Sequence, residues 1–212
     1  MREILKQLVN SYKMKNISKL ILLSIFLSAI FTNCKKGDDD PFLSLRTRTN
    51  RLSGEWKLTG ADLNMEENSS YSHSTTHTTY NNGIVIISET NGNTTDIDSL
   101  VYTQFFNIDK NGTFNQKFYT DTDTGSREGN WTWLSKNKEL GLKNKEAFIL
   151  TITKEVYDSD VDTYSGKYII PENIYVLKEL SNEKLVITID YTKTDIDGNV
   201  SYEKGTLTYT KQ

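Results

Sequence analysis

The sequence predicts a single all-β domain, an antiparallel meander that closes into a barrel of about 8–10 strands. Three observations lead to this fold class. Threonine, tyrosine, isoleucine and valine, which favour strands, are abundant beyond residue 50. Apolar and polar residues alternate in this part of the chain, and no window there shows the 3.6-residue apolar period of a surface helix. Turn signals separate the strand-like segments at the spacing of a sandwich or a barrel.

The alternation is clearest in the four segments "GTFNQKF", "GNWTWL", "KLVITIDYT" and "GTLTYTK". Every second residue in them is large and mostly apolar, as expected for a strand with one buried face. Intervening residues such as Thr188 and Asp190 would face the solvent. The side chains predicted to line a common interior are Phe114, Phe118, Trp131, Trp133, Leu185, Ile187, Ile189, Tyr191, Leu207 and Tyr209.

Tight turns are predicted at residues 109–112 ("DKNG"), 121–126 ("DTDTGS") and 195–199 ("DIDGN"), because Asp, Asn and Gly tolerate positive φ angles. Segment 68–83, "NSSYSHSTTHTTYNNG", is polar on both alternating faces. It could form an edge strand, a loop or a hairpin that reaches away from the body. We expect the hairpin, with "GIVIISET" as its returning strand.

The chain before the barrel carries export signals. The uncharged run "LILLSIFLSAIF" follows Lys13, Lys15 and Lys19, a pattern typical of a signal peptide, and a start at Met14 would give it the conventional length. We predict a signal peptide over residues 1–33, a lipidated cysteine with a flexible tether over residues 34–51, and the barrel over residues 52–212.

Cys34, the single cysteine of the chain, ends the apolar run within "FTNC". This stretch resembles the lipobox of bacterial lipoproteins, in which the cysteine is acylated and becomes the new N-terminus, although Phe31 and Asn33 depart from the usual residues. The following "KKGDDD" resembles the export signal of Bacteroidota lipoproteins. The resemblance implies that acyl chains such as palmitate anchor the protein in the outer membrane, facing the cell surface. An acylated Cys34 also leaves no thiol for a disulfide.

The charge balance argues against a nucleic-acid partner. The formal net charge is −3, and removal of the lysine-rich residues 1–33 makes the remainder more acidic. An acidic surface repels phosphate backbones, and the sequence has no basic patch with interleaved aromatic residues. It also has no Ser-His-Asp order, nucleophile elbow or phosphate-binding glycine loop. We therefore expect a protein that is not an enzyme and needs no cofactor.

Two patterns resemble metal sites but lack the required spacing or ligands. His73 and His77 would lie about 13 Å apart on one strand, at ~3.3 Å per residue, so we expect them on the solvated surface. "DSDVDTYSGKYI", residues 158–169, begins like a calcium loop, but Thr163 and Ile169 replace the glycine and the glutamate of that loop. We expect an acidic loop and no metal site there; a loose calcium site at the hairpin tips is the alternative.

Three motifs, "GEWKL", "FFNIDKNGTF" and "GNWTWL", resemble the lipocalin-like lipoproteins of Bacteroidota over most of residues 52–210. In lipocalins the tryptophan of Gly-x-Trp closes one end of the barrel, often beneath an arginine from near the last strand. Gly54 and Trp56 match these barrel-closing residues. No arginine follows Arg127, so Lys204 or Lys211 would take its place. The second lipocalin motif, around Thr-Asp-x-x-Tyr, is not found.

The resemblance implies that the barrel binds a small, largely apolar ligand. The residues expected at this site are Tyr102, Phe106, Phe114, Phe118, Trp131, Trp133 and Ile187, although aromatic residues on inward phases also form cores. The rival hypothesis is a surface interaction module with a filled barrel, which would contact a glycan or protein partner through residues 68–83. A barrel that spans the outer membrane is disfavoured, because the strands lack an outward apolar band with aromatic girdles.

Overall fold

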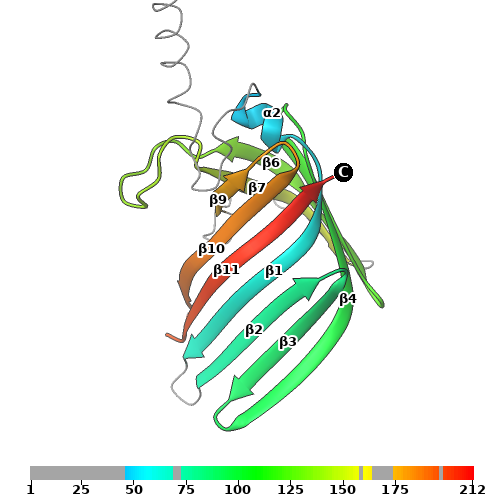
Figure 1. Ribbon diagram of the computed structural model, residues 1–212, viewed down its shortest axis with the longest axis vertical. Coiled ribbons are helices and arrows are strands. Elements are labelled where there is room, and N and C mark those ends of the chain that lie inside the picture. The colour runs from blue at the N-terminus through cyan, green and yellow to red at the C-terminus, as the bar shows by residue number, and fades with distance from the viewer. Residues whose placement is uncertain (1–45, 69–72, 158–159, 164–173, 196–197) are drawn as a thin grey trace, which may run out of the picture. The chain divides into compact units, whose positions relative to one another are not determined.

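One short helix and eleven strands make up residues 46–68, 73–157, 160–163, 174–195 and 198–212, the part of the chain that the computed structural model describes (Figure 1). These residues belong to one compact unit. The elements, in chain order, are α2 (Arg48–Leu52), β1 (Gly54–Asn68), β2 (His73–Asn81), β3 (Ile84–Asn91), β4 (Thr94–Ile108), β5 (Thr113–Thr120), β6 (Thr124–Trp133), β7 (Ala147–Tyr157), β8 (Asp160–Thr163), β9 (Ile174–Leu180), β10 (Lys184–Thr194) and β11 (Val200–Lys211).

The strands form an antiparallel meander that closes on itself. Each strand pairs with its neighbours in the order β6-β5-β4-β3-β2-β1-β11-β10-β9-β7, and pairing of β6 with β7 completes the ring. The short strand β8 extends β7 outside this ring. The all-β, closed barrel predicted from the sequence is therefore confirmed, and its ten ring strands fall within the predicted range.

The barrel is narrower at one end than at the other, because β1 changes its partner along its length. Residues 54–57 of β1 pair directly with residues 105–108 of β4, so eight of the described strands form the ring at this end. Residues 60–68 pair instead with β2, and the β2–β3 hairpin separates β1 from β4 in the other half. Figure 1 shows this hairpin at the end of the barrel away from α2.

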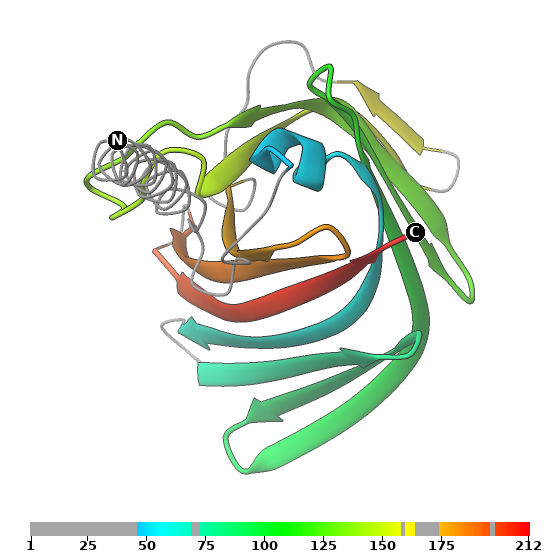
Figure 2. The ribbon, with the colours of Figure 1, turned by 45° about the horizontal axis from the view of Figure 1, so that its top comes forward.

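The narrow end holds the hydrophobic core, and helix α2 lies across it (Figure 2). We call it the closed end. Aromatic rings fill its centre, where Phe148 stacks on Tyr175 with 5.1 Å between ring centroids, and Phe106 meets Phe114 edge-on at 5.9 Å. Fully buried Leu185 and Ile187 of β10 complete the packing. The inward phases predicted for β5, β6, β10 and β11 are those seen in this core.

The predicted turn at 109–112 connects β4 to β5, and Gly112 has the positive φ angle expected of it. Between β10 and β11, the N–H of Asp195 donates to the carbonyl of Asn199 and Gly198 has a positive φ angle, while residues 196–197 lie outside the described part of the chain. The turn predicted at 121–126 is shorter, since β6 already begins at Thr124. Residues 73–81 of the polar segment form a hairpin with "GIVIISET", as predicted, and residues 69–72 lie outside the described part of the chain. It does not reach away from the body, because β2 also pairs with β1 and is part of the barrel wall.

The flexible tether predicted for residues 34–51 is wrong at its C-terminal end. Residues 48–52 form helix α2, whose first turn is capped by the Thr47 side chain, which accepts a hydrogen bond from the Asn50 N–H at 3.2 Å. Arg51 and Leu52 are almost fully buried. A short helix without propensity of its own is stabilised here by tertiary burial, which a five-residue sequence pattern cannot reveal.

Candidate functional site

The closed end is built around Trp56, which is fully buried. Its indole Nε1 donates a hydrogen bond to the Leu52 carbonyl at the end of α2, at 2.7 Å. The ammonium group of Lys211 lies 4.7 Å from the centre of the indole ring and donates to the carbonyls of Arg51, at 2.9 Å, and Ser53, at 2.6 Å. Lys211, and not Lys204, therefore takes the place predicted for a basic residue over this tryptophan.

Gly54 is required where it stands, for two reasons. Its φ angle is +136°, a conformation that side chains rarely adopt. A Cβ added at this position would lie 2.4 Å from Cε of Lys211. The Gly-x-Trp motif thus combines a glycine that lets the lysine pass with the tryptophan that the lysine covers.

Helix α2 is fixed to the barrel at two further points. The guanidinium of Arg51 donates to the carbonyl of Leu180 at the end of β9. Indole Nε1 of Trp133 donates to the hydroxyl of Thr49 at 3.0 Å. These contacts make the helix a plug for the closed end, and Trp56 beneath it is fully buried and does not line the cavity in the rest of the barrel.

A cavity of about 700 Å³ occupies the rest of the barrel interior. This volume lies within the usual range for pockets that hold small molecules. Its wall is made by inward side chains of nine of the ten ring strands and is mainly apolar and aromatic: Leu58, Ala61, Leu63, Thr78, Tyr80, Val85, Leu100, Tyr102, Gln104, Gln116, Phe118, Thr120, Arg127, Glu155, Tyr157, Tyr175, Leu207 and Tyr209.

Two of the seven residues predicted at a ligand site, Tyr102 and Phe118, line this cavity. The other five do not: Phe106, Phe114, Trp131, Trp133 and Ile187 belong to the closed-end core or pack against it. Inward alternation was read correctly for all of them. The sequence did not reveal which of these inward residues lie in the packed end of the barrel, because it does not show at which end the barrel narrows.

Polar side chains cross the cavity wall in one row. Gln116 of β5, Arg127 of β6 and Glu155 of β7 are successive cross-strand partners. Nε of Arg127 lies 2.6 Å from Oε1 of Glu155, an ion pair with both side chains partly exposed. We call these three residues the polar row. Nearby, the hydroxyl of Tyr209 donates to Oε1 of Gln104 at 2.9 Å.

Sequence reasoning missed the polar row, although a signal existed for two of its members. Gln116 lies between Phe114 and Phe118 on the inward phase of "GTFNQKF", and Arg127 is in phase with Trp131. Glu155 gave no such signal, because an irregular register between β6 and β7 shifts the alternation just before it.

The tyrosines of the cavity have pKa values above the ordinary value. Burial raises the pKa of Tyr102 to about 12, against the opposing effect of the Arg127 charge. Burial also raises the pKa of Tyr175 and raises that of Tyr209 well above its usual range. These phenols are therefore neutral hydrogen-bonding groups at physiological pH.

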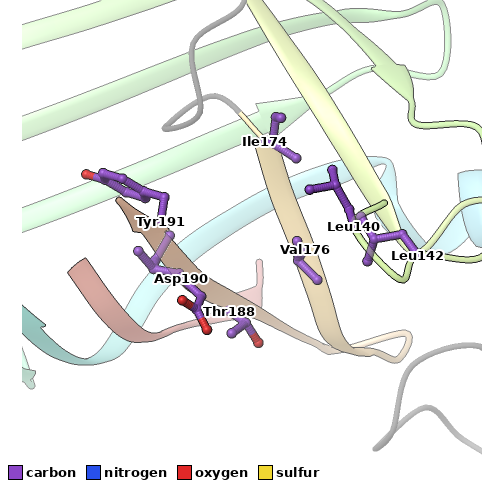
Figure 3. A pocket seen from close by; sticks show the side chains of 8 residues that line it. Leu140, Leu142, Ile174, Val176, Thr188, Asp190 and Tyr191 are labelled. Carbon is purple, nitrogen blue, oxygen red and sulfur yellow. The ribbon is translucent and has the colours of Figure 1, made fainter. Parts of the chain in front are cut away.

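A second hollow, of about 490 Å³, lies where the loop after β6 meets β9 and β10. Figure 3 shows Leu140 and Leu142 of this loop beside Ile174 and Val176, with the labelled residues of β10 on the other side of β9. Val176 and its partner Thr188 are on the outward phase of their strands. No buried polar side chain converges on this hollow among the described residues, so we assign it no ligand.

The two histidines are exposed on the outer face of the wall. Nε2 of His77 lies 3.0 Å from Oδ1 of Asp62, and Nδ1 of His73 lies 2.8 Å from Oδ1 of Asn68. Within the described ranges, no group of three His, Cys, Asp or Glu residues could hold a metal ion. Most of the calcium-like stretch 158–169 lies outside the described residues, as does Cys34.

Replacing Lys211 with methionine tests the closed end. Lys211→Met keeps the aliphatic stem but leaves the carbonyls of Arg51 and Ser53 without their donor, so we expect the free energy of unfolding to fall by about 1–3 kcal/mol in urea. Lys204→Met, on the exposed part of the same strand, is the matched control and should change it by less than about 0.5 kcal/mol. Equal midpoints for the two variants would contradict this account of the plug.

The raised tyrosine pKa values predict that the barrel loses stability at alkaline pH. Above pH 10 the tyrosines of the unfolded chain ionise while Tyr102, Tyr175 and Tyr209 stay protonated in the fold, so stability falls as pH rises toward about 12. Burial lowers the pKa of Lys211 from its ordinary 10.5, so this residue makes the free energy of unfolding rise with pH, but only below pH 10.5. Urea unfolding between pH 10.5 and 12 isolates the tyrosines, and Tyr102→Phe should flatten the decline. A flat profile in the unchanged protein would refute the assignment.

Among the described residues, no helix has the length and apolarity that crossing a membrane requires. Comparison of the chain with family models, with curated proteins and with solved structures gave no significant match.

Proposed function

We propose that this protein is a lipocalin-like lipoprotein that binds a small, largely apolar molecule inside its barrel, without catalysing a reaction. The observation that carries the proposal is the cavity of about 700 Å³. Leu58, Leu63, Leu100 and Leu207 supply aliphatic surface and the tyrosines supply aromatic surface, whereas few polar groups converge on it. This is the composition of sites that hold a ligand mainly by burial of apolar area.

The lipocalin-like assignment rests on the closed end as well as on the cavity. A glycine and a tryptophan on the first ring strand, covered by a basic residue from the last strand, close the barrel at one end only. A cavity above a floor of packed side chains suits a carrier or receptor, because the floor fixes how deep the ligand can enter.

The proposal places the protein at the outer membrane, facing the cell surface. It rests on the lipobox-like "FTNC" and on the "KKGDDD" stretch that follows. Several acyl chains on Cys34 would anchor the chain firmly. The rival hypothesis, an interaction module with a filled barrel, receives less support, since its premise of a packed interior does not agree with the cavity.

A cavity-filling variant tests ligand binding. Ala61 faces the cavity, so Ala61→Trp should place an indole in the space that a ligand would occupy. The neutral dye N-phenyl-1-naphthylamine should fluoresce strongly with the unchanged protein, and its affinity should fall about tenfold or more in this variant, by loss of buried apolar area. Thr79→Trp, on the outward phase of β2, is the control that should bind normally. Equal binding by both variants would mean that the dye binds outside the barrel.

Metabolic labelling tests the anchor. We expect Cys34→Ser to abolish incorporation of a palmitate analogue and to move the protein from the membrane fraction to the soluble fraction, because the serine cannot take the thioether-linked lipid. Asn33→Gly, which brings the site closer to the usual lipobox, is the matched control and should be labelled at least as well as the unchanged chain. Labelling that persists in the serine variant would exclude acylation at Cys34.

A further inference from the structure

Gln116 is a buried polar side chain that faces the cavity without a partner. It is 4% exposed and it lines the cavity, and none of the side-chain hydrogen bonds seen among the described cavity residues involves its amide. Gln104, one strand away, has its amide oxygen occupied by the hydroxyl of Tyr209. An amide that faces a largely apolar cavity can both donate hydrogen bonds to a guest molecule and accept them from it. Gln116 is therefore a polar contact point for a ligand within the cavity.

The arginine beside Gln116 does not make this contact point a site for anions. Arg127 is the only basic side chain among the described residues that line the cavity, and its Nε lies 2.6 Å from the carboxylate of Glu155. A carboxylate ligand would have to compete with Glu155 for the guanidinium of Arg127. It would also be repelled at short range by the negative charge of Glu155. The polar row therefore has no net charge of its own.

The mouth of the cavity is acidic. Beyond the cavity wall, the inward phases of the strands continue into carboxylates, which the register places on the inner face: Glu67 of β1, Glu89 of β3, Asp96 and Asp98 of β4, and Glu203 of β11. The only basic side chain on the inner face of these described strand ends is Lys193. A cleft lined by charges of one sign concentrates counter-ions and repels ions of the same sign. Cations are favoured at this entrance.

The aromatic residues of the cavity wall also favour a cationic ligand. Tyr80 and Tyr102 meet edge-on at 6.3 Å between centroids, and Tyr157, Tyr175 and Phe118 add further rings. Ring faces attract an ammonium group through their quadrupole, more strongly where water is excluded. A neutral phenol also accepts hydrogen bonds from such a group.

We propose that the ligand is an amphipathic organic cation, an amine whose apolar body fills the cavity and whose ammonium group lies against Gln116 and the tyrosine rings. This inference rests on the proposed function and narrows its ligand class. It separates the protein from a carrier of fatty acids, whose carboxylate would meet the acidic mouth and the occupied arginine.

Three probes with one apolar body test the inference: 4-phenylbutylamine, 4-phenylbutanol and 4-phenylbutyrate. Calorimetric titration of the full chain in nanodiscs of zwitterionic lipid, with empty nanodiscs as the blank, gives the three affinities. We expect the amine to bind at least about tenfold more tightly than the carboxylate, with the alcohol between them, and the preference to shrink as salt is added. Binding of the carboxylate as tight as that of the amine would overturn the inference while leaving the proposed function in place. Binding of none of the three would overturn both.

Variants test which charged residues cause the preference for the amine. Glu155→Gln frees the guanidinium of Arg127, so it should weaken amine binding and strengthen carboxylate binding. The double variant Asp96→Asn/Asp98→Asn should weaken amine binding several-fold, whereas Asp62→Asn/Glu66→Gln, which removes the same charge from the outer face of β1, should not. Equal losses from the inner and outer pairs would contradict a role for the mouth. Circular dichroism checks that each variant is folded.

Discussion

The change of partner along β1 is the constraint on which the rest of the barrel depends. A strand can pair with one neighbour on each side at any point, so β1 must leave β4 before it can accept β2. An irregularity between Leu58 and Gly60 in its pairing with β11 lies at this point. On the closed-end side of this irregularity, the ring of strands is small enough for side chains to fill its interior. On the other side the inserted hairpin widens the ring, and the interior is no longer filled.

The two ends consequently differ in chemistry. At the closed end, indole and guanidinium donors from Trp56, Trp133 and Arg51 meet acceptors on α2 or β9, and Lys211 satisfies two carbonyls where the helix ends. These hydrogen bonds fix the position of the helix, although Nε of Arg51 is buried without a hydrogen-bond partner among the described residues. In the wide half, Gln116 has no described partner, and the inner face becomes acidic toward the mouth. The proposed ligand binding rests on this difference between a packed floor and a cavity lined by a free-standing amide.

Much of the fold could be predicted because it depends on local patterns. Alternation in "KLVITIDYT" places Leu185 and Ile187 inward whatever their neighbours are, and Asp-Gly and Asn-Gly pairs define turns through backbone sterics. The hairpin of residues 73–91 was harder to place. Its inward residues are mostly polar because they line the wide half, so the usual mark of a barrel strand, a continuous apolar face, is missing.

The sequence by itself determined the fold class, the inward and outward phase of β5, β6, β10 and β11, and the main turns, since each of these follows from nearest neighbours along the chain. The short Gly-x-Trp motif led to the expectation of a basic residue over Trp56, with Lys204 and Lys211 both as candidates. Only the tertiary structure decided which inward residues meet a cavity and which are core. Phe114 and Phe118 stand four residues apart on one face of β5, yet the first is packed into the closed end and the second lines the cavity. The reason is that barrel width depends on how many strands close the ring at a given height, and that number is set by pairings between segments far apart in the sequence.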